Sequence, residues 1–126
     1  MKQSNNVNSN LADIGQLYQF NLGSSSLSFV QGLNTLTVHT QLPAGRYLFT
    51  INGVHESSGG TYGIYDVLFT ADDKTTRIYY GGQSTPLMSL ACVHDISAIC
   101  DIKLSLYATG DYTTHSTWDI QAVKLR

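Results

Sequence analysis

Apolar and polar side chains alternate over the eleven residues from Ala98 to Ala108, and no other feature of the sequence constrains the fold as strongly. The apolar set consists of Ala98, Cys100, Ile102, Leu104, Leu106 and Ala108, and the set between them includes Asp101, Lys103 and Ser105. An α-helix would spread the polar residues around its circumference, whereas a β-strand places them on one face. This stretch therefore predicts a β-strand with one face in a core.

Shorter stretches with strand-like character follow one another along the chain, separated by turn-forming residues. We expect further strands within the ranges 17–22, 27–29, 36–38, 47–51, 64–70, 77–80, 87–93 and 117–125. The segment Gly23-Ser24-Ser25 is expected to break the chain after the first of them, and Asp72-Asp73-Lys74 to form a hairpin tip. This spacing predicts an all-β fold, namely an antiparallel two-sheet β-sandwich of jelly-roll type with eight or nine strands.

The composition agrees with an all-β fold and with a single domain. The chain has 126 residues, and 13% of them are charged, about half of the usual share. Glu56 is the single glutamate, although helix surfaces are usually rich in glutamate and lysine. We expect residues 1–12, which are rich in asparagine and serine, to form a flexible leader, and residues 13–126 to form one knob domain.

Three segments carry apolar residues on both faces, namely 47–51, 87–93 and 118–125. A lone sandwich buries only one face of each sheet, so the other face of these strands needs a cover. We therefore expect a homotrimer, in which contacts between identical copies supply that cover. The alternation slips at Val123, which indicates either a bulge or a final strand that is buried on both faces.

Residues able to carry chemistry do not form a recognisable catalytic or metal-binding pattern. The four histidines lack the short spacing of a zinc site, and Asp72-Asp73 lacks the further oxygen ligands that calcium needs. The lysines and arginines are scattered, and no apolar stretch reaches the roughly 18 residues of a membrane span. We expect a protein that is not an enzyme, with no cofactor, no metal, no nucleic-acid partner and no membrane insertion.

The two cysteines, Cys92 and Cys100, leave two alternatives open. A disulfide between them would close a hairpin and would favour an extracellular protein. Two free thiols in the core are the other alternative, since free cysteine is among the most buried residue types.

Aromatic residues near the expected strand ends and loops are the better indication of a binding surface. They are Tyr62, Tyr65, Tyr79, Tyr80, Tyr107, Tyr112 and Trp118. Tyrosine combines a flat apolar ring with a hydroxyl group, which suits sugars and protein surfaces alike. We expect most of these rings to be structural. Tyr62, Tyr112 and His115 lie in segments rich in glycine, serine and threonine, and we expect these three to be exposed loop residues that bind a receptor.

The order of the expected elements also resembles a known family. A turn at Pro43-Ala44-Gly45 leads directly into the strand 46–51, and a hairpin, a long alternating strand and a closing strand with Trp118 follow. Over roughly residues 33–125 this order resembles the trimeric jelly-roll heads of the tumour necrosis factor and complement globular-head type. The chain lacks the aromatic–glycine motif that closes that family's domains after Trp118, which favours a viral relative.

The leader and the final residues Lys124-Leu125-Arg126 resemble the distal tips of bacteriophage tail fibres and tail needles. This resemblance implies a homotrimeric knob that is assembled in the host cytoplasm and located at the tail tip of the virion. Its partner would be a receptor on the host cell surface, either a glycan or a protein. The alternative is a monomeric, secreted carbohydrate-binding module or lectin domain within a larger protein.

Overall fold

The computed structural model describes residues 14–58, 61–81, 87–97 and 101–126, and these residues form eight β-strands. The strands are β1 (Leu17–Phe29), β2 (Gly32–His39), β3 (Gly45–His55), β4 (Ile64–Ala71), β5 (Lys74–Tyr80), β6 (Leu87–Ile96), β7 (Asp101–Ala108) and β8 (Tyr112–Lys124). The leader expected at residues 1–12 lies outside the described residues, and so does Cys100 with the two alternatives for the cysteine pair. Among the described residues, no helix is long and apolar enough to cross a membrane.

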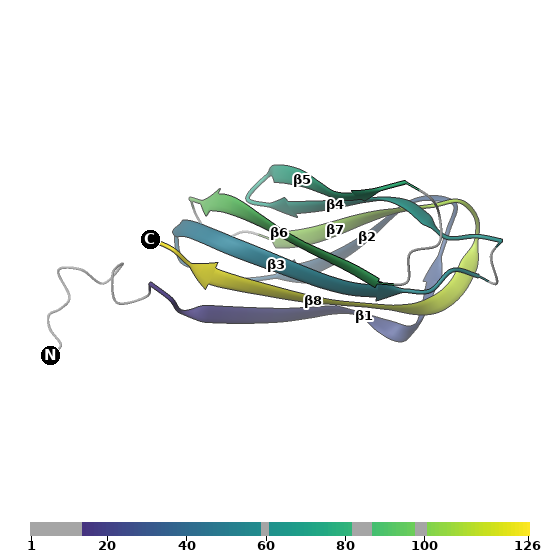
Figure 1. Cartoon of the computed structure of the whole chain (residues 1–126), viewed down its shortest axis with the longest axis horizontal. Helices are drawn as coiled ribbons and strands as arrows, with labels where there is room; N and C mark the ends of the chain where they lie inside the picture. The colour runs from purple at the N-terminus through teal and green to yellow at the C-terminus, as the bar shows by residue number, and fades with distance from the viewer. Residues whose placement is uncertain (1–13, 59–60, 82–86, 98–100) are drawn as a thin grey trace, which may run out of the picture.

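The strands pair in antiparallel fashion and form two four-stranded sheets. The first sheet has the order β1-β8-β3-β6, and the second has the order β2-β7-β4-β5. Figure 1 shows the two sheets as two layers whose strands run along the long axis of the molecule. Because the chain passes from one sheet to the other at nearly every connection, the topology is that of a jelly roll. This confirms the predicted antiparallel β-sandwich.

The core lies between the two sheets and follows the alternation read from the sequence. Ile102, Leu104 and Leu106 of β7 are fully buried, while Lys103 between them is exposed. The strand is thus confirmed over residues 101–108, and residues 98–100 lie outside the described part of the chain. Such a row of buried branched side chains is a main source of the hydrophobic stabilisation of the fold.

A second part of the core is built around Trp118 of β8. Its register partner on the adjacent strand β3 is Gly53, and a Cβ atom at Gly53 would overlap the indole ring. The indole therefore fills the space that a side chain at Gly53 would need. Trp118 is 1% exposed, although it is the largest side chain in the protein.

Several strands extend beyond their expected ranges, and two of these differences, at Gly23 and at Tyr112, change the structure expected there. Gly23 does not end the first strand, because β1 continues to Phe29 through a bulge between Ser24 and Leu27. Gly23 has a φ of 87°, and its missing Cβ allows the backbone to lie against Ser116 of β8. At the other end of the chain, β8 begins at Tyr112, ahead of the expected start at Thr117.

The slip in alternation at Val123 comes from apolar residues on both faces of β8 and not from a bulge. The pairing of β8 with β3 runs in unbroken register from Ser116 to Lys124. Val123 therefore lies on the outer face of the first sheet, half-buried, and the long side chain of Lys124 turns inward.

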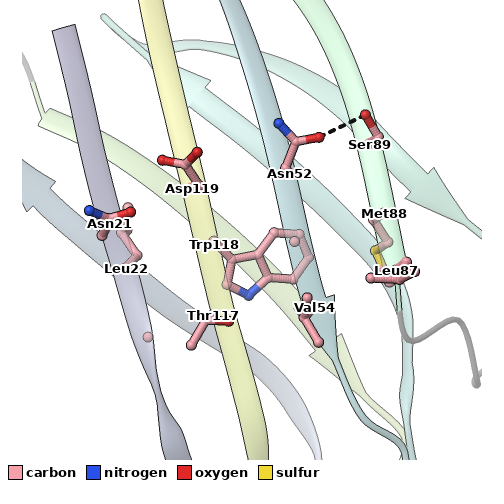
Figure 2. A pocket seen from close by; sticks show the side chains of 12 residues that line it. Asn21, Leu22, Asn52, Val54, Leu87, Met88, Ser89, Thr117, Trp118 and Asp119 are labelled. Carbon is pink, nitrogen blue, oxygen red and sulfur yellow. Dashed lines mark hydrogen bonds between the residues drawn. The ribbon is translucent and has the colours of Figure 1, made fainter.

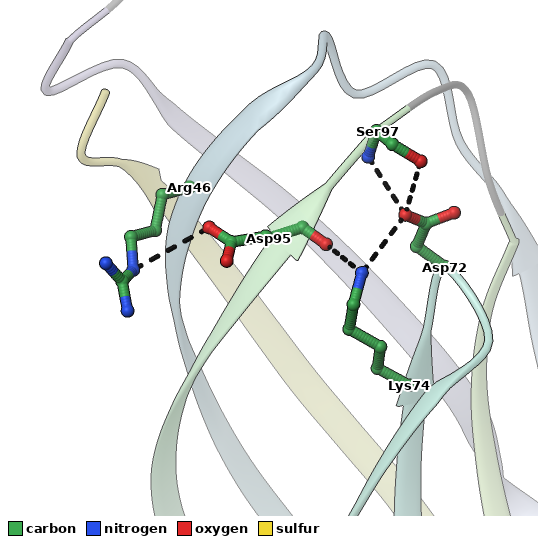
Figure 3. A network of polar contacts seen from close by, with 5 residues as sticks. All are labelled: Arg46, Asp72, Lys74, Asp95 and Ser97. Atoms are coloured by element: carbon green, nitrogen blue, oxygen red, sulfur yellow. Dashed lines mark hydrogen bonds and ion pairs between the residues drawn. The ribbon is translucent and has the colours of Figure 1, made fainter.

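The hairpin predicted at Asp72-Asp73-Lys74 joins β4 to β5, with φ values of 52° and 61° at the two aspartates. Its tip is bonded to the end of β6 in the other sheet (Figure 3). Asp72 Oδ2 accepts hydrogen bonds from the backbone nitrogen and the hydroxyl of Ser97, each at 2.9 Å, and Lys74 Nζ donates to the backbone oxygen of Asp95 at 2.8 Å. The bonds from Ser97, the backbone bond first, hold the pKa of Asp72 below its ordinary value. This network connects the two sheets at one edge.

We expect Gly53→Ala to lower the free energy of unfolding by roughly 1–3 kcal/mol, because the new methyl group would displace the indole of Trp118. Trp118 is the only tryptophan of the sequence, so its fluorescence during urea unfolding at a fixed protein concentration gives the measurement. The control is Asn52→Ala at the adjacent exposed position, which should change that free energy by about 0.5 kcal/mol or less. Equal effects of the two substitutions would contradict the packing described for Trp118.

Candidate functional site

The structure brings together two of the three residues predicted to bind a receptor. The rings of Tyr62 and Tyr112 are stacked, with their centroids 6.3 Å apart and an interplanar angle of 25°. Tyr62 is 38% exposed and covers Gly110, where a Cβ atom would collide with its ring. The expectation that Tyr112 is an exposed loop residue is wrong, because Tyr112 begins β8, is 9% exposed and stacks on Phe29. The pair thus presents mainly the ring of Tyr62 to solvent.

Beneath this pair lies a buried chain of polar groups. The Tyr112 hydroxyl lies 2.6 Å from His55 Nε2, and His55 Nδ1 lies 2.9 Å from the Ser116 hydroxyl. Trp118 Nε1 donates to the same Ser116 oxygen at 2.9 Å. Neutral imidazole offers one donor and one acceptor nitrogen, and a hydroxyl can fill either role, so the chain is satisfied without a charge.

Burial of this chain shifts the pKa values of two of its members. Desolvation lowers the pKa of His55 to about 4, and desolvation raises the pKa of Tyr112 to about 12. Both groups are therefore neutral at pH 7. Perturbed pKa values can mark a catalytic site, but here they follow from packing under the rings of Phe29 and Tyr112.

His115 lies apart from the tyrosine pair. It belongs to β8 and not to a loop, so the expected loop placement is wrong for this residue as well. Its side chain is half-buried, and its Nε2 lies 3.0 Å from the Thr117 hydroxyl. Because Thr117 lines a hollow on the outer face of the first sheet, His115 borders that hollow.

The hollow has a volume of about 720 Å³ and extends across all four strands of the first sheet (Figure 2). Two rows of register partners form its outer lining: Asn21, Asp119, Asn52 and Ser89, and beside them Gly23, Thr117, Val54 and Leu87. Ser89 donates a hydrogen bond to Asn52 at 2.9 Å, and the Gln19 amide donates to Asp119 at the same distance. One row of the lining is therefore apolar apart from Thr117, and the other consists of polar side chains, of which Asp119 is the single charged one.

Most of the outer face of the first sheet is without charge. In four successive register rows across the four strands, Asp119 alone among the sixteen outward residues is ionisable. Beyond these rows, at the end of the sheet, Arg46 on β3 and Asp95 on β6 form an exposed ion pair at 3.7 Å. One complete row across the sheet is apolar and consists of Leu17, Val123, Leu48 and Val93. Leu17 is 50% exposed and Val93 46% exposed, so the row lies at the surface of the single chain. The apolar outer positions of the predicted segments are thereby confirmed.

The outer face of the second sheet carries charge throughout. Its ionisable side chains include Asp101 and Lys103 on β7, Asp66 on β4 and Arg77 on β5. Asp66 and Arg77 form an ion pair across β4 and β5, with Nε to Oδ1 at 2.8 Å. Charged side chains thus lie in the middle of the second sheet, whereas on the first sheet Arg46 and Asp95 lie at one end and Asp119 alone interrupts the uncharged rows.

In the part of the chain that the structure describes, no group of side chains is placed to bind a metal ion. No three histidine, cysteine, aspartate or glutamate side chains there lie close enough together to hold a metal ion. His94 and Asp95 are neighbours on β6 and point to opposite sides, since His94 is buried against Phe49 and Asp95 is exposed near Arg46.

Comparison with known proteins shows similarity of fold without similarity of sequence. Neither a protein-family model nor a curated protein sequence matches this chain. The VP2 protein of an infectious bursal disease virus subviral particle is similar with a TM-score of 0.61 at 12% identity, over 88% of this chain and 35% of that one. The chain thus spans about a third of VP2.

The vertex protein P5 of PRD1 is similar with a TM-score of 0.54 at 13% identity, over 86% of this chain and 96% of the P5 chain. The similarity to the CBM36-1 domain of a multidomain xylanase, from the hindgut metagenome of Trinervitermes trinervoides, has a TM-score of 0.46 and is too weak to support an inference. The chain therefore shares a β-sandwich fold with viral structural proteins.

We expect the free energy of unfolding to fall as the pH is lowered from about 6.5 to about 4, because His55 takes up a proton in the unfolded chain but stays neutral in the folded one. The contribution of His55 to the free energy of unfolding is complete above pH 6.5 and lost below pH 4, and it amounts to roughly 2–3 kcal/mol. The lowered pKa of His94 acts in the same direction.

Urea unfolding at a series of pH values measures this dependence. The His55→Gln variant should lose a large part of the slope between pH 6.5 and 4, whereas His39→Gln, at a side chain that is 86% exposed, should keep it. A His55→Gln variant with the slope of the original chain would show that the buried imidazole does not control stability in this range.

Proposed function

We propose that the protein is the tip domain of a bacteriophage tail fibre or tail needle, which attaches the virion to the host cell surface as a homotrimer. The observation that carries the proposal is the outer face of the first sheet, where four register rows hold Asp119 as their single ionisable residue and one row, Leu17, Val123, Leu48 and Val93, is wholly apolar. Fully buried interface cores are depleted of charged residues in the same way. In a trimer, this face of each copy packs against its neighbours in a closed ring.

The fold supports the viral part of the proposal. The similarity to the PRD1 vertex protein P5 extends over 96% of the solved P5 chain, so a sandwich of this size accounts for nearly all of that chain. Jelly rolls are frequent among viral structural proteins and among lectins. The second sheet, with its ionisable side chains, would then form the outside of the trimer and face water.

In this knob, Tyr62, Tyr112 and His115 serve receptor binding in different ways. Tyr62 offers an exposed ring at the end of the sandwich, and Tyr112 supports that ring from below. His115 lies at the border of the hollow, beside Thr117. Aromatic rings that are held in place lose little entropy on binding, which makes Tyr62 the strongest of the three as a contact.

Light scattering coupled to gel filtration tests the trimer directly. We expect a mass three times that of the 13.8 kDa chain. Leu48→Lys places a charge at the centre of the apolar row and should shift the mass towards that of one chain, because a buried charge without a partner is costly. The control, Thr35→Lys on the exposed outer face of β2, should keep the mass. A single-chain mass for the unaltered protein would contradict the trimer and favour the monomeric carbohydrate-binding module.

Attachment is tested with fluorescently labelled protein on a panel of intact bacterial strains, measured by flow cytometry. We expect saturable binding to some strains, and weaker binding for Tyr62→Ala and His115→Ala at an unchanged melting temperature. Tyr112→Ala should lower the melting temperature as well, because its ring is buried under Tyr62 and bonded to His55. If neither Tyr62→Ala nor His115→Ala changes binding, the receptor contacts lie on another surface.

A further inference from the structure

The outer face of the second sheet carries a row of side chains that no expectation from the sequence brought together. Leu33, Tyr107, Asp66 and Tyr80 are successive register partners on β2, β7, β4 and β5. The row therefore crosses the whole sheet, and at a strand spacing near 4.8 Å it is about 14 Å long. Leu33 is 52% exposed and Tyr80 is 70% exposed, so both ends of the row are open to solvent.

An ion pair fixes the polar part of the row. Arg77 donates from Nε and Nη2 to the two carboxylate oxygens of Asp66, at 2.8 and 3.0 Å, and its guanidinium carbon lies 5.0 Å from the ring centre of Tyr80. Asp66 is 7% exposed, whereas the side chain of Arg77 is 56% exposed. The guanidinium is thus held in one orientation by two hydrogen bonds to Asp66 on one side and by the ring of Tyr80 on the other.

The paired guanidinium still has hydrogen-bonding capacity that points outward. A guanidinium carries five N–H donors, and Asp66 uses two of them; with respect to the residues that the structure describes, three are left for a ligand. Tyr107 is the register partner of Asp66 on β7, and its ring lies against that of Tyr65, with centroids 6.1 Å apart. The site offers flat apolar rings next to oriented donors, while its two opposite charges cancel.

A pyranose ring presents the complementary chemistry. One face of the sugar consists of C–H groups that pack on an aromatic ring, and hydroxyl groups around its rim accept and donate hydrogen bonds. Because Asp66 already balances the charge of Arg77, the site favours an uncharged ligand over an anionic one. A row about 14 Å long accommodates several sugar units and not a single one.

We propose that Tyr107 and Tyr80 of this row, together with the adjacent Arg77, bind a neutral oligosaccharide. The inference rests on the proposed attachment function and names the class of receptor, a glycan of the host surface. It is compatible with the trimer, because the row belongs to the second sheet, and the apolar face that would be buried belongs to the first.

The test uses the full chain on an array of neutral oligomers of glucose, galactose, xylose and N-acetylglucosamine, followed by calorimetry with the oligomers that bind. We expect binding that changes little between low and high salt, since no net charge is involved. Tyr80→Ala should weaken it about tenfold or more through the loss of stacking, and Tyr80→Phe should keep most of it.

Arg77→Lys keeps the positive charge but removes the planar guanidinium with its fixed N–H donors. It should also weaken binding, because lysine cannot bond both oxygens of Asp66 and donate outward. The matched control is Thr75→Ala, at an exposed position on the same strand β5, which should leave the affinity unchanged. The melting temperatures of the variants are measured in parallel, so a loss of folding is distinguished from a loss of contacts.

Three results would overturn the inference: binding to acidic glycans only, neutral-glycan binding that Tyr80→Ala does not weaken, or no glycan binding. In the last case, labelled protein that still binds cells after periodate oxidation of their surface sugars would identify a protein receptor. The trimer mass and the binding to whole cells are measured independently of the glycan array. The proposed attachment function can therefore be confirmed or contradicted whatever the array shows.

Discussion

The fit of Trp118 over Gly53 is the contact on which one whole end of the sandwich depends. The indole lies in the space left by the missing side chain, and from there its Nε1 reaches the hydroxyl of Ser116. Ser116 in turn holds His55, and His55 holds the hydroxyl of Tyr112. A side chain at Gly53 would therefore disturb more than local packing, because the polar chain beneath the exposed ring of Tyr62 begins at the indole.

The second organising constraint is the uneven distribution of charge over the two sheets. In the first sheet, inward residues build the core, and the outward residues of four register rows are apolar or neutral apart from Asp119, with the Arg46–Asp95 ion pair at the end of the sheet. The second sheet carries charge across the middle of its outer face. In a single chain in water, the apolar row that contains Leu48 and Val93 would stay at the surface, and a contiguous exposed apolar patch usually marks an interaction surface. The asymmetry gives each sheet a separate role in the proposal, one for assembly and one for contact with the host.

The sequence indicated the architecture well, because alternation at period two is a direct record of which face is buried. Ile102, Leu104 and Leu106 are the clearest example, and the apolar residues on both faces of β3, β6 and β8 also lie as expected. The errors concern places where a local rule was overridden by pairing. Gly23 reads as a break, but β8 supplies a partner for the strand on both sides of it, and a bulge absorbs the irregularity.

The candidate site was harder to predict, because its residues become neighbours only through pairing across strands. Tyr112 reads as a loop residue from its surroundings of glycine and threonine, yet the stacking of Phe29 and Tyr62 on both sides of its ring buries it. Asp66 and Arg77 are eleven positions apart in sequence, and nothing local shows that their side chains meet. Tyr80 stood out as one of several tyrosines, and its place beside that pair is set by a hairpin register.

The bulges have a consequence for how copies of this chain can meet. The strands β1 and β5 are edge strands, one in each sheet, and each contains a bulge, around Ser24 to Leu27 and at Ile78. A strand added along such an edge would lose its hydrogen-bonding register at the irregular residue, so growth of the sheets into fibrils is blocked on these two sides. Edge-to-edge extension is thereby disfavoured along β1 and β5, and of the four edges only those at β6 and β2 keep a regular register.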